Sequence, residues 1–479
     1  MLLVPPMSAS SPSISRAGLV AEIRTTLVLA APLVAGHVST GLIGFVDNTL
    51  AGHHSTNTLA SVTIGTALWW LPMMVPIGTL LAVPPSVSQL EGAGRRGEIG
   101  ALFRQALWMA VLLSVFLFAF LTFIPYALGA MGIAPEIIPG ARDFLHGIRW
   151  GVPALTLFFC MRYLSEGLHW TLPTMVLSAG GLLVLLPLGY VLTFGKFGLP
   201  EMGAGGLGIA SAVMLWIQAI GFFFVLRGAK RFADLRLFER FDKPHWPTIR
   251  SLLATGLPIG VTVLMEGSLF IVTALLIGRL GAIPASAHQI AINLSALCFM
   301  VPMGLAEATT VRVGHALGRR DYAGVRRAGS AGYAIVIGTQ LVSGILLLTA
   351  NDVLVSFYTA DAAVASLAAS LLLYSAMFQF PDGIQVLSAG ALRGLKDTRV
   401  PMVLAALAYW GVGMPVGAFL GLGLNWGPKG MWIGLIAGLT VASVLLCARF
   451  IRSSRPDRLA ERMASESPHE VDPHETGCT

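Results

Sequence analysis

The chain has 479 residues, of which 55% are hydrophobic and only 11% are charged, and its formal net charge is +7. A soluble globular protein carries about 25% charged residues. With so few charged residues, the chain cannot form a water-compatible surface. The composition therefore excludes an ordinary soluble protein and predicts a chain embedded in a lipid bilayer.

The two ends of the chain differ from the rest. The first 16 residues are rich in Pro and Ser and lack the long apolar core of a cleaved signal peptide. The sequence from Ser453 onward is rich in Ser, Glu, His and Pro. We therefore expect residues 1–24 and 451–479 to be disordered cytoplasmic tails.

A helix that crosses the hydrocarbon region needs about 20 mainly apolar residues. Twelve segments meet this requirement, which predicts an all-α integral membrane protein with six helices in each half. The predicted spans are 25–46, 58–83, 101–124, 143–161, 172–194, 203–226, 251–278, 284–309, 328–350, 364–390, 400–422 and 429–450. They divide the chain into an N-lobe at 25–226, a cytoplasmic linker at 227–250 and a C-lobe at 251–450.

The second half of the chain repeats the first. Adding 226 to a residue number takes Pro32 to Pro258 and Gly78 to Gly304. Because each half has an even number of spans, both halves insert in the same orientation, and the predicted pseudo-two-fold axis runs along the membrane normal. Duplicated bundles with matching Gly and Pro positions are typical of secondary transporters.

Basic residues fall in alternate connections between the spans. They gather before the first span and after each even-numbered span, whereas the loops at 47–57 and 351–361 contain no Lys or Arg. The positive-inside rule therefore predicts that both termini are cytoplasmic. This arrangement also explains the net positive charge, so we do not expect a nucleic-acid partner.

Three acidic residues stand out in or directly beside the predicted spans. Glu266 and Asp382 are deep in the C-lobe, and Asp47 is near the outer end of the first span. An ionised side chain at the bilayer centre costs about 2.5–3.5 kcal/mol on insertion scales. A buried carboxyl without a basic neighbour exchanges a proton readily or takes Na⁺ in its place, and Pro381 exposes a carbonyl oxygen beside Asp382. The alternative is a protonated carboxyl that only packs.

Other residues are candidates for lining a cleft between the lobes, with core packing as the alternative. These candidates are Met265, Phe270, His288, Gln289, Asn293 and Gln385. Glu307 and Arg312, near the inner end of span 284–309, are expected to form an interfacial salt bridge or gate. We find no Walker A, HExxH or GxSxG motif. The sequence therefore predicts a protein that is not an enzyme and needs no cofactor beyond a coupling ion.

Several ordered stretches resemble one known family. They are Gly44-Phe45-Val46-Asp47, Met265-Glu266, Ala287-His288-Gln289-Ile290-Ala291, Arg312-Val313-Gly314-His315 and Leu392-Arg393-Gly394-Leu395-Lys396-Asp397. Together they resemble the multidrug and toxic compound extrusion (MATE) family, in its NorM-like bacterial branch. The resemblance implies a monomeric transporter in the bacterial inner membrane. It would export organic, often cationic, drugs and dyes in exchange for Na⁺ or H⁺.

The resemblance also implies roles for the three acids. Glu266 and Asp382 match the cation site of the second lobe, where a proton or Na⁺ would bind, and Asp47 matches a first-lobe site. Relatives often carry Asn-x-Pro-x-Asn in span 172–194, whereas this chain has Leu185-Leu186-Pro187-Leu188-Gly189. Asp47 thereby loses expected partners, which favours the second-lobe site.

The alternatives belong to other classes. A flippase for a lipid-linked oligosaccharide would line its cleft with cations, whereas the charges here are mainly acidic. A membrane-embedded prenyl transferase would need acidic Mg²⁺ motifs that we do not find. Export of an endogenous metabolite stays open.

Overall fold

The computed structural model describes residues 16–239 and 242–466, and every regular element in them is a helix. The first half contains α1 (Arg16–His54), α2 (Thr56–Leu80), α3 (Val83–Gly92), α4 (Arg96–Phe123), η1 (Ile124–Ala127), α5 (Ile138–Ile148), η2 (Arg149–Gly151), α6 (Val152–Gly167), α7 (Leu172–Phe194) and α8 (Gly203–Gly228). The 3₁₀ helix η3 (Lys230–Leu235) lies in the linker.

The second half contains α9 (Trp246–Gly278), α10 (Ala282–Gly318), α11 (Tyr322–Thr349), α12 (Asn351–Ser356), α13 (Ala362–Gly394), α14 (Arg399–Ala406), the π-helical η4 (Leu407–Gly413), α15 (Met414–Ala418), the π-helical η5 (Phe419–Gly423), α16 (Pro428–Ser453) and α17 (Pro456–Glu466). Within the described residues, twelve helical segments are long and apolar enough to cross a bilayer. This number agrees with the twelve predicted spans.

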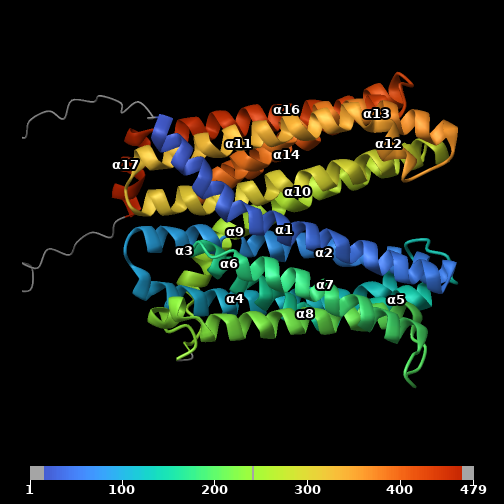
Figure 1. Cartoon of the computed structure of the whole chain (residues 1–479), viewed down its shortest axis with the longest axis horizontal. Helices are drawn as coiled ribbons and strands as arrows, with labels where there is room; N and C mark the ends of the chain where they lie inside the picture. The colour runs from blue at the N-terminus through green and yellow to red at the C-terminus, as the bar shows by residue number, and fades with distance from the viewer. Residues whose placement is uncertain (1–15, 240–241, 467–479) are drawn as a thin grey trace, which may run out of the picture.

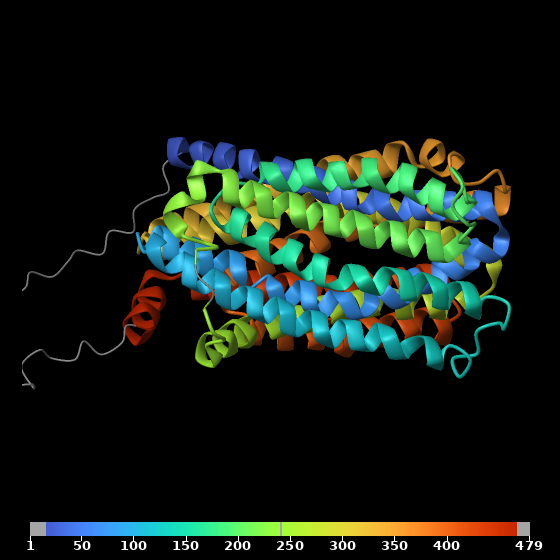
Figure 2. The same ribbon diagram turned by 90° about the horizontal axis from the view of Figure 1, so that it is seen from below.

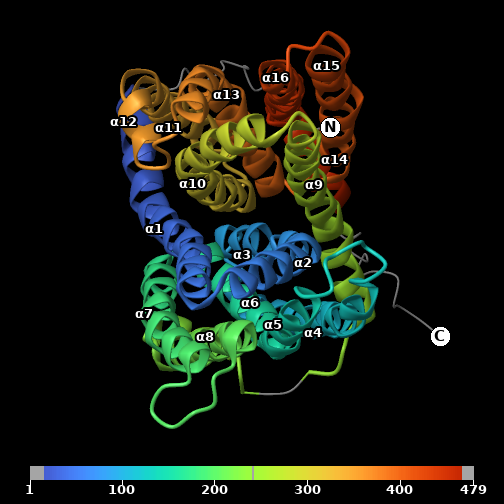
Figure 3. The ribbon, with the colours of Figure 1, turned by 90° about the vertical axis from the view of Figure 1, so that its right-hand side faces the viewer.

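The helices form two bundles with parallel long axes (Figure 1). Seen end-on in Figure 3, α2 to α8 make one bundle and α10 to α16 the other, and α1 and α9 run between them. The start of α1, η3 and α17 all lie towards one end of the molecule, which we call the terminal end (Figure 2). The other end is called the distal end.

The lobes contact each other through pairs of residues that the repeat relates. Gly304 of α10 packs against the backbone of Val34 on α1, and its counterpart Gly78 packs against Gly260 on α9. Further along, Gly41 faces Met300, and Gly267 faces Met74. In each case the second pair is the first shifted by 226 residues, with the lobes exchanged. These reciprocal contacts are the structural expression of the pseudo-two-fold axis.

Nearer the terminal end, α3 and α10 cross at a third reciprocal pair of contacts. Gly92 lies against the carbonyl of His315, and Gly318 lies against the carbonyl of Gln89. No side chain fits between such backbones, which is why glycine occupies both positions. The lobes are thus held together from the middle of the bundle to the terminal end.

The expected disordered tail at residues 1–24 needs correction, because α1 already begins at Arg16. The helix continues here because it has a surface to pack on. Glu22 accepts two hydrogen bonds from Arg312 of α10, at 2.7 and 2.8 Å, and Ile23 packs against a small core shared with α10 and α11. Residues 1–15 lie outside the described part.

The other two expected irregular segments are also shorter than predicted. In the expected tail at 451–479, α16 continues to Ser453 and α17 follows, because Leu459 is buried against Leu446 and Phe450 of α16. Residues 467–479 lie outside the described part. In the linker, Phe232 and Leu235 of η3 are buried against the N-lobe, and α9 begins at Trp246 rather than at 251.

Candidate ion site and the junction between the lobes

Glu266 of α9 and Asp382 of α13 lie close enough to interact electrostatically. Asp382 follows Pro381 inside α13 and is 2% exposed, whereas Glu266 is half-buried. The predicted pair of acids is therefore brought together although 116 residues separate them in the sequence. Two ionised carboxylates that lie close together repel each other, so a proton or a cation bound between them lowers their electrostatic energy.

Two further side chains complete this acidic pair. The Gln385 amide, one turn beyond Asp382, donates to the hydroxyl of Tyr409 and faces Glu266 at hydrogen-bonding range. Tyr409 is fully buried on η4, where the π-helical turns interrupt the regular helix of the predicted span 400–422. Asp382 Oδ1 and Gln385 Oε1 are buried without a hydrogen-bond partner among the described residues. Such unpaired oxygens are chemically suited to a proton or to a hard cation such as Na⁺.

Asp47 does not join this group in the structure. It lies on α1 in the N-lobe, is 6% exposed, and its Oδ1 has no hydrogen-bond partner among the described residues. The neighbouring helix α7 presents apolar groups here: Leu185 is fully buried, and Gly189 packs against Leu50. The apolar sequence around Pro187 thus leaves Asp47 buried without amide partners.

His288 and Phe270 belong to an aromatic cluster within the C-lobe. His288 is 2% exposed, and its ring centroid lies 5.9 Å from that of Trp432. Phe378 links Trp432 to Phe270 at 5.6 and 6.0 Å. The geometry of His288 is therefore that of a packed side chain, although its Nδ1 has no hydrogen-bond partner among the described residues. Met265, beside Glu266, is half-buried against the same core.

Gln289 and Asn293 lie on another face of α10. Both are exposed, and Gln289 Nε2 donates to Asn293 Oδ1 at 3.0 Å. The helical spacing that joins them continues to Met300 and Gly304, the residues that contact α1 of the other lobe. Gln289 and Asn293 consequently lie on the side of α10 that faces the N-lobe, on the distal side of the contact region.

A buried ion-pair cluster joins the lobes, and Glu307 is its one member that the sequence predicted to form a salt bridge. Arg162 of α6 donates to Glu166 at 2.6 Å and to Glu307 of α10 at 3.2 Å. His37 of α1 lies 2.9 Å from the same Glu307 carboxylate, and Thr174 of α7 donates to Glu166 at 3.0 Å. The four charged or titratable residues are each at most 8% exposed. We call Arg162, Glu166, Glu307 and His37 the junction.

The junction extends beyond the predicted fourth span, 143–161. The helix α6 continues to Gly167 and buries Arg162 and Glu166. Their spacing of four residues in an otherwise apolar stretch is the signal that could have indicated an intrahelical pair. The expected salt bridge between Glu307 and Arg312 is wrong, because Glu307 pairs with Arg162 and Arg312 pairs with Glu22.

Two lobes of six spanning segments, related by a pseudo-two-fold axis and holding acids within the spans, define a membrane transporter of the duplicated-bundle class. The MatE family model matches residues 32–191 and again residues 258–419, so each lobe matches it once. The chain is 68% identical over 435 residues to the probable multidrug resistance protein NorM of Xanthomonas campestris pv. campestris, covering 91% of this chain and 95% of that protein. It is 43% identical over 441 residues to the multidrug resistance protein PmpM of Pseudomonas aeruginosa, covering 91% and 92%.

Solved structures agree with the fold. The eukaryotic MATE transporter AtDTX14 superimposes with a TM-score of 0.84 at 20% identity, covering 94% of this chain and 99% of that one. A multidrug resistance MATE family transporter of the MOP superfamily, in its outward-facing conformation, superimposes with a TM-score of 0.84 at 16% identity over 92% and 97%.

The chain belongs to the MatE family. It is therefore a multi-pass bacterial membrane protein and a multidrug efflux transporter rather than an enzyme.

Proposed function

We propose that the chain is an antiporter of the bacterial inner membrane that exports organic, mainly cationic, compounds in exchange for Na⁺ or H⁺. The relatives named as multidrug resistance proteins support small organic substrates. The Arg and Lys residues of the terminal end support a cytoplasmic location for that end and for both termini. One chain contains both lobes and the acidic pair, which supports a monomeric transport unit.

The observation that carries the proposal is the acidic pair with its unpaired oxygens. Glu266 lies next to Gly267, which contacts Met74 of the other lobe, so the pair adjoins the surface along which the lobes meet. A proton or Na⁺ bound at Glu266 and Asp382 removes negative charge there. That loss weakens the attraction for a cationic substrate and favours its release, which couples the two fluxes through differential affinity.

The closed terminal end supports an outward-facing state in this conformation. The glycine contacts between α3 and α10 and the ion pair between Arg162 and Glu307 both cross the lobe boundary on this side. In the proposed cycle the lobes rock about the middle of the bundle, so these contacts separate when the substrate site opens to the cytoplasm. Substrate binding and ion release at that stage reset the transporter.

Reconstituted protein tests the proposal. Purified chain in liposomes is given ethidium, with a Na⁺ gradient and a pH gradient imposed in separate experiments. Dye movement driven by one gradient, and absent without it, is the expected result and names the coupling ion. If neither gradient moves ethidium or another organic cation, the antiport proposal is wrong, and a flippase or a dedicated metabolite exporter becomes the better hypothesis.

A further inference from the structure

Three potential metal ligands meet at the terminal end, away from the acidic pair. They are Glu91 at the end of α3, His169 just after α6, and His315 in the last turn of α10. One ligand atom from each residue lies within 4.8 Å of the other two. All three residues are half-buried. These three residues, which we call the His–Glu cluster, have no part in the proposed ion coupling at Glu266 and Asp382.

Each imidazole in the cluster has a ring nitrogen without a hydrogen-bond partner among the described residues. His169 Nδ1 lies 3.2 Å from Glu91 Oε2, and the two histidine rings meet edge to face with centroids 4.9 Å apart. His169 Nε2 and His315 Nδ1 are buried without a hydrogen-bond partner among the described residues. Histidines that only pack usually satisfy their buried nitrogens. Two imidazoles and a carboxylate are instead a common ligand set for Zn²⁺, which leaves a further position for water.

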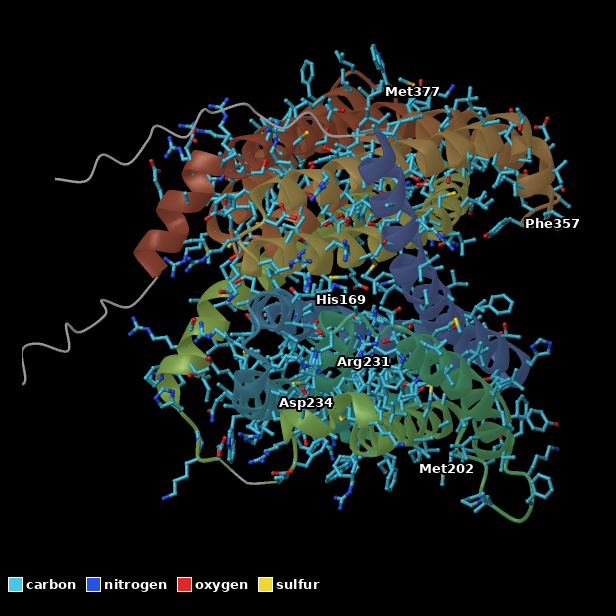
Figure 4. The ribbon with its side chains drawn as sticks, turned by 60° about the vertical axis from the view of Figure 1, so that its left-hand side comes forward. His169, Met202, Arg231, Asp234, Phe357 and Met377 are labelled. Atoms are coloured by element: carbon cyan, nitrogen blue, oxygen red, sulfur yellow. The ribbon has the colours of Figure 1, made fainter. Side chains whose placement is uncertain are left out.

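Neighbouring residues hold the ligands in place, as second-shell groups do at metal sites. Arg96 donates to Glu91 Oε1 at 2.8 Å, which leaves Oε2 directed at His169. Asp234 of η3 pairs with Arg96 at 2.8 Å and offsets its charge. Arg231 of η3 donates to the carbonyl of Leu168 at 2.6 Å and fixes the turn that carries His169. Figure 4 shows His169, Arg231 and Asp234 gathered in one region of the N-lobe.

Other positive groups act on the cluster and bear on its affinity for a cation. Arg312 and Arg319 both act electrostatically on His315. Arg312 is already paired with Glu22 at 2.7 Å. The charge of Arg96 is shared between Glu91 and Asp234. Because positive groups lie near the cluster, it favours a metal that bonds strongly to imidazole, such as Zn²⁺ or Ni²⁺, over Mg²⁺ or Ca²⁺.

The repeat does not duplicate the cluster. The counterparts of Glu91 and His315 are Leu317 and Gln89. His169 corresponds to Lys396, where the offset is 227 residues (396 − 169), because both residues have a left-handed backbone just after a helix, with φ of 60° and 56°. None of these three counterparts is a strong metal ligand. The cluster is therefore an addition to one side of the scaffold and not a consequence of the duplicated packing.

We propose that Glu91, His169 and His315 form a transition-metal site that bridges the two lobes and holds the terminal end closed. Glu91 and His169 belong to the N-lobe and His315 to the C-lobe, so all three reach one ion only while the lobes touch. A ligand that binds one of two states favours that state by 1 + [L]/Kd, a factor of about 100 at 100 times Kd. The metal thus stabilises this conformation, and its effect on export rests on the proposed alternating access.

Zinc titration of the purified full chain tests the site without any transport measurement. The affinity tag is removed, and ZnSO₄ binding is measured by calorimetry for wild type and for His169→Gln, His315→Gln and Glu91→Gln. We expect one Zn²⁺ per chain and at least about tenfold weaker binding for each variant. His53→Gln, at an exposed histidine near the distal end, is the matched control and should bind as wild type does.

The same titration can overturn the site. Absence of zinc binding by wild type, or equal affinity in the His169→Gln/His315→Gln double variant, contradicts it. Size-exclusion profiles and the thermal midpoints without metal establish that the variants fold. Glu91→Gln keeps the side-chain size and an oxygen for Arg96, so it remains informative if a histidine variant unfolds.

Ethidium export in proteoliposomes then tests whether a bound metal holds the terminal end closed. Zn²⁺ on the terminal side should slow export by wild type several-fold, EDTA should restore it, and His315→Gln should be insensitive. Zinc that binds at the cluster without slowing export overturns the closure. If no gradient drives export, the antiport proposal fails, and the calorimetric result still decides the metal site.

Discussion

Gly78 of α2 and Gly260 of α9 meet backbone to backbone across the lobe boundary. A Cβ atom added at Gly78 would lie 2.5 Å from the Cα of Gly260. The repeat places the same contact between Gly304 and Val34, where the closest backbone atom would be 2.9 Å away. Close packing of backbones through small residues is the usual way in which membrane helices associate.

Substitution of Gly78 should therefore separate the lobes. We expect Gly78→Val to destabilise the contact between the lobes in the middle of the bundle by about 1–3 kcal/mol, the usual cost of overpacking. The measurements are thermal unfolding in detergent and ethidium export. Gly180→Ala is the control, since a Cβ there meets nothing within 4 Å. Equal stability and export in Gly78→Val and Gly180→Ala would contradict the close contact.

The junction should be sensitive to loss of its cation. Arg162→Met leaves Glu166 and Glu307 buried near each other, and removal of one member of a buried ion pair costs about 3–5 kcal/mol. We expect a lower free energy of unfolding, with partial recovery in Arg162→Met/Glu307→Gln, because the second change removes a buried charge. A double-mutant cycle measures that coupling.

An exposed pair provides the comparison for the junction. Arg95, 60% exposed, pairs with Glu98 at 2.6 Å, and this hydrogen bond raises the pKa of Arg95. Exposed pairs contribute about 0–1 kcal/mol. Arg95→Gln should change the free energy of unfolding by no more than that. A larger effect at Arg95 than at Arg162 would contradict the assignment of the junction as a structural contact between lobes.

The ion pair between Arg96 and Asp234, which holds η3 of the linker against α4, should weaken in acid. The hydrogen bond from Arg96 lowers the pKa of Asp234 below its ordinary value of 3.8. A lowered pKa in the folded state means that the stabilisation is present above pH 3.8 and is lost as the pH falls through the folded value. Because Asp234 is half-exposed, the contribution is at most about 1 kcal/mol. Asp234→Asn should be less stable than wild type at pH 7, and the difference should shrink as the pH falls below 3.8. A difference that grows on acidification would contradict this.

Tyr409 should affect ion binding at Glu266 and Asp382 through its hydrogen bond with Gln385. Tyr409→Phe removes the acceptor of the Gln385 amide, and a net hydrogen bond is worth about 0.5–1.5 kcal/mol. We expect the coupling-ion concentration for half-maximal ethidium export to shift by roughly two- to tenfold. Tyr374→Phe, at a half-buried tyrosine of the same lobe, is the control. An unchanged ion dependence in Tyr409→Phe would separate Tyr409 and Gln385 from the ion site.

The sequence predicted the spans well because apolar length is a local property. It also predicted the repeat, since Gly78 and Gly304 keep their spacing where backbones touch. The sequence could not predict that Arg162 pairs with Glu307, or Glu307 with His37, because 145 and 270 residues separate these partners. Hydropathy placed the start of the first helix too late, at residue 25, because the contact between Glu22 and Arg312 depends on the other lobe. The proximity of Glu266 and Asp382 is a feature of the fold, and their role in coupling remains a prediction.

The most direct test of that role is ion-driven ethidium export by Glu266→Gln and Asp382→Asn in proteoliposomes. Both substitutions keep the side-chain size and remove the titratable charge. Glu98→Gln, which changes an exposed acid at the terminal end, is the matched control. We predict that either C-lobe variant loses the dependence of export on the ion gradient while Glu98→Gln keeps it. Gradient-driven export that persists in both C-lobe variants would contradict the assignment of the coupling ion to this pair.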